Sequence, residues 1–244
     1  MIRPGVRFLI CSGPLLAPAF PLTKALHRRY GRAESRKFFA GIAGTITLQQ
    51  ALVARALFHH PARRHRLTPI DVITLSRGCA SGVLTGLAVS GIRDRRGTAG
   101  WLGWIALLYG AILCDWLDGP IARHLGTSDL GTIFDLEGDS WLTLCSAGAA
   151  TAWGGLPRAI MAAPLLRYAL LFEALRQAPY RALHGDEPGW VRHMGIAQML
   201  VFIAGLAPFG GRATRLAVGI VAPLQAPLQV AGLLLLHTRR KRPS

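Results

Sequence analysis

Long apolar segments alternate with short polar connections along most of this chain. Six segments approach the roughly 20 apolar residues that a helix needs to cross a bilayer. They are Val72 to Ile92, Trp101 to Leu117, Gly131 to Trp153, Leu156 to Leu175, Val191 to Phe209 and Leu216 to His237. Glycines and prolines such as Pro69, Gly97 and Gly210 fall in the gaps, where helices end. The pattern predicts an all-α integral membrane protein built on a bundle of six transmembrane helices.

The first 65 residues follow a different pattern. The apolar run Phe38 to Phe58 is long enough to cross a membrane but contains Gln49, Gln50 and Arg55. It could be a seventh span or a helix lying in the membrane interface, and its strongly basic flanks favour the interface. Met1 to Phe20 looks like a signal peptide, but prolines interrupt it and no clear cleavage site follows, so we expect it to be retained. We therefore divide the chain into a basic, membrane-associated helical extension (1–65) and a six-helix core (66–244).

Composition supports a membrane location. Of the 244 residues, 51% are hydrophobic and 16% are charged, against about 25% charged in soluble domains. The 28 Lys and Arg outnumber the 12 Asp and Glu and give a net charge of +16. These cations lie in short runs between apolar segments, as in segments that face anionic membrane lipid. No nucleic-acid reader motif accompanies them, so we expect no nucleic-acid partner.

The distribution of arginines predicts the orientation. An even number of spans places Arg63 to Arg66 on the same side as Arg239 to Arg242, and this side should be cytoplasmic. Arg93, Arg95 and Arg96 then lie outside, against the usual bias. We expect a multi-pass protein of the cytoplasmic membrane.

Acidic residues inside apolar segments are costly and are usually functional. Asp115 and Asp118 are three residues apart, while Gly131, Asp135 and Asp139 are each four apart. Residues at such spacings lie on one face of a helix. A short connection between the two helices then lets their two stripes of carboxylates face each other. Opposed carboxylates repel unless cations lie between them, and Mg²⁺ or Mn²⁺ suits oxygen ligands. Two such ions could clamp a pyrophosphate; a transporter with an ion-paired polar core is the alternative, which this spacing disfavours.

The same segment carries a complete motif. It reads Asp115-x2-Asp118-Gly119-x2-Ala122-Arg123, then seven residues, then Gly131-x3-Asp135-x3-Asp139. All eight fixed positions are similar to the signature of the CDP-alcohol phosphotransferases. The resemblance covers the chain from about Leu67 onward and implies the displacement of CMP from a CDP-linked donor by an acceptor hydroxyl.

The resemblance also implies residue roles. Four aspartates would hold two divalent cations, Mg²⁺ or Mn²⁺: Asp115, Asp118, Asp135 and Asp139. Asp139 would also be the general base. The nucleotide-binding positions would be Asp71, Thr74, Gly119, Ala122, Arg123 and Gly131. Asp71 belongs to an element, Asp71-x-x-Thr74-x-x-Arg77, in which the family usually has Asn first. An ionised carboxylate cannot donate hydrogen bonds, and a helix N-cap is the alternative role for Asp71.

The sequence does not identify the acceptor alcohol. The residue after the last aspartate is Ser140, whereas Lys or Arg stands there in two subgroups of the family. A phosphorylated acceptor would need cations, for which Arg167, Arg192 and Arg215 are candidates. The alternatives are snorkelling to the interface for Arg192 and Arg215, and a pair with Glu173 for Arg167. The membrane setting favours CDP-diacylglycerol over a soluble CDP-alcohol as donor, and the family suggests a homodimer.

Overall fold

The protein is described here by a computed structural model of the chain. The described residues are 17, 19–59, 69–91, 102–103, 105–110, 113, 129–154, 156–177, 189–206 and scattered positions between 218 and 232. Their longer elements are α2 (Ala19–Tyr30), α3 (Arg32–His59), α4 (Pro69–Ser90), α6 (Asp129–Gly154), the 3₁₀ helix η3 (Arg158–Met161), α7 (Ala162–Gln177) and α8 (Gly189–Leu206). These residues contain no strand, so the predicted all-α class is confirmed for this part of the chain.

Four of the predicted core helices are recognisable. α4, α6 and α8 nearly coincide with the segments predicted from Val72, Gly131 and Val191. The segment predicted from Leu156 instead begins as η3 and becomes α-helical at Ala162, so that Pro164 lies in the first turn of α7. A proline is tolerated there because the first turn of a helix has no intrahelical acceptor to offer its nitrogen.

The other two predicted core segments are described only in part: residues 102–103, 105–110 and 113 of the segment from Trp101, and scattered positions of the segment from Leu216, are helical. Of the helices that the structure describes, none has both the length and the apolar character needed to cross a bilayer. The number of spans and their orientation remain predictions.

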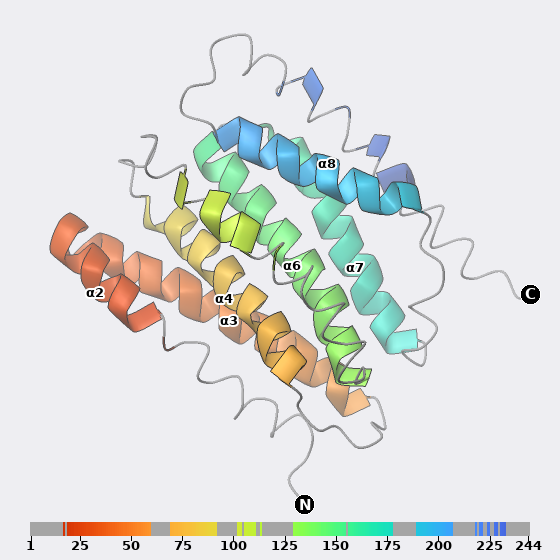
Figure 1. Cartoon of the computed structure of the whole chain (residues 1–244), viewed down its shortest axis with the longest axis horizontal. Helices are drawn as coiled ribbons and strands as arrows, with labels where there is room; N and C mark the ends of the chain where they lie inside the picture. Colours follow the sequence, from red (N-terminus) through yellow and green to blue (C-terminus); the bar gives the residue numbers. More distant parts are fainter. Residues whose placement is uncertain are drawn as a thin grey trace, which may run out of the picture.

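The helices lie beside one another in the order α3, α4, α6 and α7, with α8 packed across α6 (Figure 1). α3 and α4 are antiparallel, since Phe38 contacts Gly86, Ile46 contacts Gly82 and Gln49 contacts Gly78. α3 thus runs alongside α4 in the opposite direction. Whether residues 38–58 cross the membrane as a seventh span or lie in its interface stays a prediction.

Glycines allow the backbones of α3 and α4 to approach closely. A Cβ atom on Gly86 would lie 2.6 Å from the carbonyl oxygen of Phe38, and one on Gly41 would lie 2.7 Å from the Cα atom of Gly86. No side chain fits at such a backbone contact, so glycine is required at both positions.

The substitution Gly86→Ala is therefore expected to force α3 and α4 apart. The free energy of unfolding should fall by about 1–3 kcal/mol, as for other overpacked sites. Gly44→Ala is the matched control, because a Cβ at Gly44 meets nothing within 4 Å. Thermal denaturation of both purified variants checks the prediction, and an equal midpoint for the two would contradict it.

The extension folds back on itself before it reaches α4. α2 and α3 are joined at Gly31, whose φ of 92° is in the left-handed region that favours glycine. The turn brings Ala19 of α2 against Phe38 and Ile42 of α3 in one buried apolar cluster, which also includes Ile46. Exposed cations surround the turn: Arg28, Arg29, Arg32, Arg36 and Lys37.

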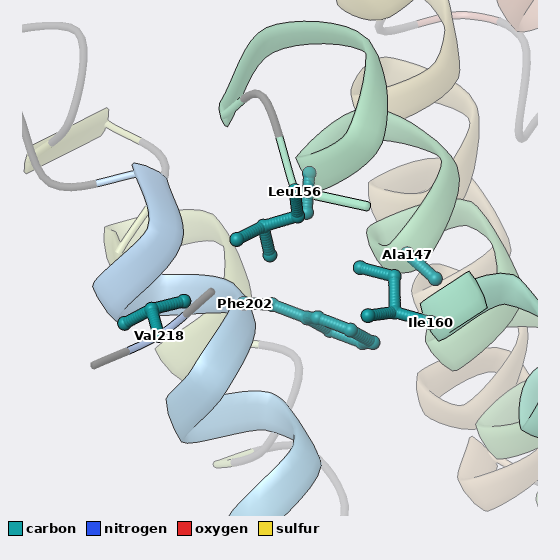
Figure 2. Packing of buried hydrophobic residues seen from close by; sticks show 6 residues of the cluster. Ala147, Leu156, Ile160, Phe202 and Val218 are labelled. Atoms are coloured by element: carbon teal, nitrogen blue, oxygen red, sulfur yellow. The ribbon is translucent and has the colours of Figure 1, made fainter. Parts of the chain in front are cut away.

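α6 is the centre of the remaining core. On one side, Ala147 packs with Leu156, Ile160, Phe202 and Val218, and Figure 2 shows the Phe202 ring lying among these side chains. A second cluster joins α6 to α4 and to the helix at 105–110 through Leu84, Leu108, Leu142 and Ala149. α6 is thereby held on several sides, and its first turns, which carry the acidic stripe, have a rigid base.

Candidate active site

A buried ion pair connects α4 to the acidic stripe of α6. Arg77 donates from Nη1 to Oδ1 of Asp139. The Arg77 side chain is 1% exposed, whereas that of Asp139 is 42% exposed. A buried guanidinium is costly without an anionic partner, and a charge-assisted hydrogen bond of this kind is among the stronger ones. The pair therefore holds the Asp139 carboxylate in place while part of it stays open to solvent or ligand.

The predicted acidic stripe lies on one helix. Gly131, Asp135 and Asp139 all belong to α6, which runs without interruption from Asp129 to Gly154. Their four-residue spacing places the three positions on one face. The side chain of Asp139 is described, while those of Gly131 and Asp135 are not.

Five other predicted positions lie outside the described residues altogether: Asp115, Asp118, Gly119, Ala122 and Arg123. The facing arrangement of the two carboxylate stripes therefore remains a prediction.

The predicted nucleotide element begins α4. The helix starts at Pro69, so Asp71 lies within its first turn rather than before it, and the N-cap alternative for Asp71 is wrong. Thr74 and Arg77 follow at three-residue intervals, so each lies near the preceding one on the helix surface. The side chains of Asp71 and Thr74 are not among those described.

The two residues that follow Asp139 contact α7. Arg167 donates from Nε to the hydroxyl oxygen of Ser140, at 3.2 Å, and Ser140 is buried. The next residue, Trp141, packs on Tyr168 with ring centroids 5.2 Å apart. The buried Nε1 of Trp141 has no hydrogen-bond acceptor within the described part of the chain.

Of the three candidate acceptor-binding arginines, the structure thus places Arg167 beside the residue that follows Asp139. The side chains of Arg192, in α8, and of Glu173, the alternative partner of Arg167, are not described. Arg215 lies outside the described residues.

Of the four predicted ligands, the structure describes one side chain, that of Asp139, and its carboxylate suits a hard divalent cation. Carboxylate oxygens are the ligands that Mg²⁺ prefers, and Asp139 presents such oxygens at a partly exposed position. The described residues contain no group of three His, Cys, Asp or Glu side chains that could hold a metal. Three of the four predicted ligand side chains, those of Asp115, Asp118 and Asp135, are outside that set.

Two residues of this region were not assigned a role from the sequence. The motif has Arg77 as its last residue without indicating that it pairs with Asp139, and Ser140 enters the sequence pattern only as a position that differs between subgroups of the family. The signal for Arg77 is its position, because an arginine at the sixth position of the apolar segment Val72 to Ile92 requires a polar partner. Ser140 carries no such signal, since a serine is common on any helix.

Comparison with known proteins identifies the family. A family model described as CDP-alcohol phosphatidyltransferase matches residues 67–234. Comparison with curated proteins and with solved structures found no match. The chain belongs to the CDP-alcohol phosphatidyltransferase family, whose members are integral membrane, metal-dependent enzymes. They transfer a phosphoalcohol group from a CDP-linked donor in phospholipid synthesis. The match begins just before α4, so α2 and α3 lie outside it.

Proposed function

We propose that this protein transfers a phosphatidyl group from CDP-diacylglycerol to the hydroxyl of an acceptor alcohol. The new bond joins the acceptor oxygen to the lipid-side phosphorus, the bond from that phosphorus to CMP breaks, and CMP leaves. The family match over residues 67–234 carries the proposal, and the complete eight-position signature within it supports the reaction. The apolar surroundings of the motif favour a lipid-linked donor over a soluble CDP-alcohol.

Four carboxylates would hold two divalent cations: Asp115, Asp118, Asp135 and Asp139. When bound, the cations would neutralise the charge of the pyrophosphate and the leaving CMP. A second set of positions would border the CMP moiety: Asp71, Thr74, Gly119, Ala122, Arg123 and Gly131. The small residues in this set leave room for a nucleotide near the backbone, and Arg123 offers a planar fork to a phosphate.

Asp139 would take the proton from the attacking hydroxyl. A general base must be ionised, oriented and accessible to the acceptor. The buried Arg77 orients the Asp139 carboxylate, and the 42% exposure of that side chain leaves it accessible. These two properties support Asp139 as the base.

The acceptor would bind between α6 and α7, next to Asp139. Arg167 is held there through Ser140, and the Trp141 indole N–H lies close by in sequence. Both groups are hydrogen-bond donors, which suits an acceptor rich in oxygen atoms. Arg192 and Arg215 would contribute further positive charge. We place the site on the cytoplasmic side of a homodimeric, six-span protein.

Release of CMP is the direct test of the function. The purified protein is incubated with labelled CDP-diacylglycerol, Mg²⁺ or Mn²⁺, and a panel of acceptors: glycerol 3-phosphate, inositol phosphate, inositol, serine and phosphatidylglycerol. We expect acceptor-dependent CMP release that a chelator abolishes and either cation restores, because the anionic carboxylates repel the pyrophosphate unless cations lie between them.

A reaction without acceptor controls for hydrolysis of the donor, and a soluble CDP-alcohol tests the alternative donor class. If neither donor releases CMP with any acceptor, the phosphotransferase assignment fails and the transporter interpretation of the aspartates gains support.

A further inference from the structure

α3 lies outside the family match yet contacts α4 directly beside Arg77. We propose that Gln49 of α3 is a positioning residue, which holds α4 where Arg77 meets Asp139. The proposal rests on the proposed function for its catalytic consequence, although the contacts themselves do not depend on it. It gives the basic extension a role in the active site of this chain.

The first step is the contact between Gln49 and Gly78. A Cβ atom on Gly78 would lie 2.5 Å from Oε1 of Gln49, so the amide of Gln49 occupies the space that a side chain at 78 would need. Gln49 is 4% exposed, and Gly78 is also buried. Farther along the same interface, Ile42 and Ile46 make the equivalent contacts. The polar contact therefore lies at the end of the interface that carries Arg77.

The second step is the geometry of α4. Gly78 contacts α3, while its neighbour Arg77 pairs with Asp139 of α6. α4 is thus held between α3 on one side and α6 on the other, as Figure 1 shows. Packed helices move as nearly rigid units because interiors are dense. A displacement of α4 at Gly78 therefore also moves the backbone of Arg77, the preceding residue, relative to Asp139.

The third step is the sensitivity of the ion pair. A hydrogen bond weakens steeply when its geometry changes, and a misplacement of about 1 Å in a catalytic group can lower the rate by about 10²-fold. A partial shift of Arg77 should therefore reduce turnover more than it reduces the stability of the fold.

The test compares Gly78→Ala with Gly82→Ala. Both add one methyl group to the same face of α4, but the methyl at 78 meets Gln49, and that at 82 meets Ile46 and Ile42 at 3.1–3.4 Å. We expect Gly78→Ala to lower kcat about 10-fold while Gly82→Ala keeps most of it, at similar melting temperatures. Gln49→Ala alone should lower kcat as well, because removal of the side chain takes away the contact that holds α4 at Gly78.

A second measurement needs no turnover. Thermal melting of Arg77→Gln, Asp139→Asn and their combination gives the coupling between the two residues. We expect this coupling to be lost in the Gly78→Ala background and kept in the Gly82→Ala background. If the wild type releases no CMP, the proposed function fails, but the coupling still decides whether Gln49 positions Arg77.

Equal coupling in the two backgrounds overturns the proposal, even if kcat falls, because Gln49 would then act by another route. Should Gly78→Ala fail to fold, Gln49→Ala takes its place in the melting experiment, since removal of the side chain also frees α4 at this point. Retained coupling in that variant is then the contradicting result.

Discussion

The substitution Asp139→Asn is expected to abolish transfer while binding of the CDP-linked donor survives. The amide has nearly the shape of the carboxylate but cannot accept a proton at neutral pH. General-base catalysis contributes about 10²–10⁴-fold, and the variant also loses an anionic oxygen that a divalent cation would use. The measurements are CMP release by the purified variant and competition binding of the donor.

Glu137→Gln is the matched control for this experiment. It makes the same chemical change in the same helix, two residues away, and residues two apart do not share a helix face. We expect it to retain turnover. If Asp139→Asn also retains turnover, Asp139 is not the base.

The substitution Arg77→Met should cause the second largest loss of activity. Without the guanidinium, the Asp139 carboxylate is no longer oriented, and we expect turnover to fall about 10²-fold. Removing one partner of a fully buried pair costs about 3–5 kcal/mol. Because Asp139 is 42% exposed, water can solvate the remaining carboxylate, so we expect a stability loss of only about 1–2 kcal/mol.

Arg77→Lys separates charge from geometry in the same position. It keeps the positive charge but lacks the planar fork of the guanidinium, so we expect intermediate turnover. CMP release and thermal melting of both variants test this prediction. Wild-type turnover in Arg77→Met would show that Asp139 does not depend on Arg77.

Three helices meet around Asp139. α4 supplies the cation that orients the carboxylate, α6 supplies the carboxylate itself, and α7 supplies Arg167 beside the next residue. α3 lies behind α4 and contacts it through Gln49. The eight-position motif lies within the matched region, residues 67–234, whereas α3, which packs on α4, lies outside it.

The amino-acid pattern alone predicts the helical class, the approximate boundaries of α4, α6 and α8, and the family. Apolar length and breaker residues act locally, so their pattern along the chain predicts where helices begin and end. The eight-position signature likewise depends only on spacing in the sequence. The late start of α7 is also a local effect, since it follows from Pro164.

Which residues contact one another across helices depends on the packing of the whole chain. Arg77 and Asp139 are 62 positions apart, and Gln49 meets Gly78 because two antiparallel helices approach through glycines. Helical periodicity predicts the face of the helix on which a residue lies, but not which other helix packs against that face. The pairing and the register of two helices are set by side-chain packing between segments that are distant in the sequence. For that reason the sequence did not predict that α3 of the basic extension packs on α4, the helix that carries Arg77.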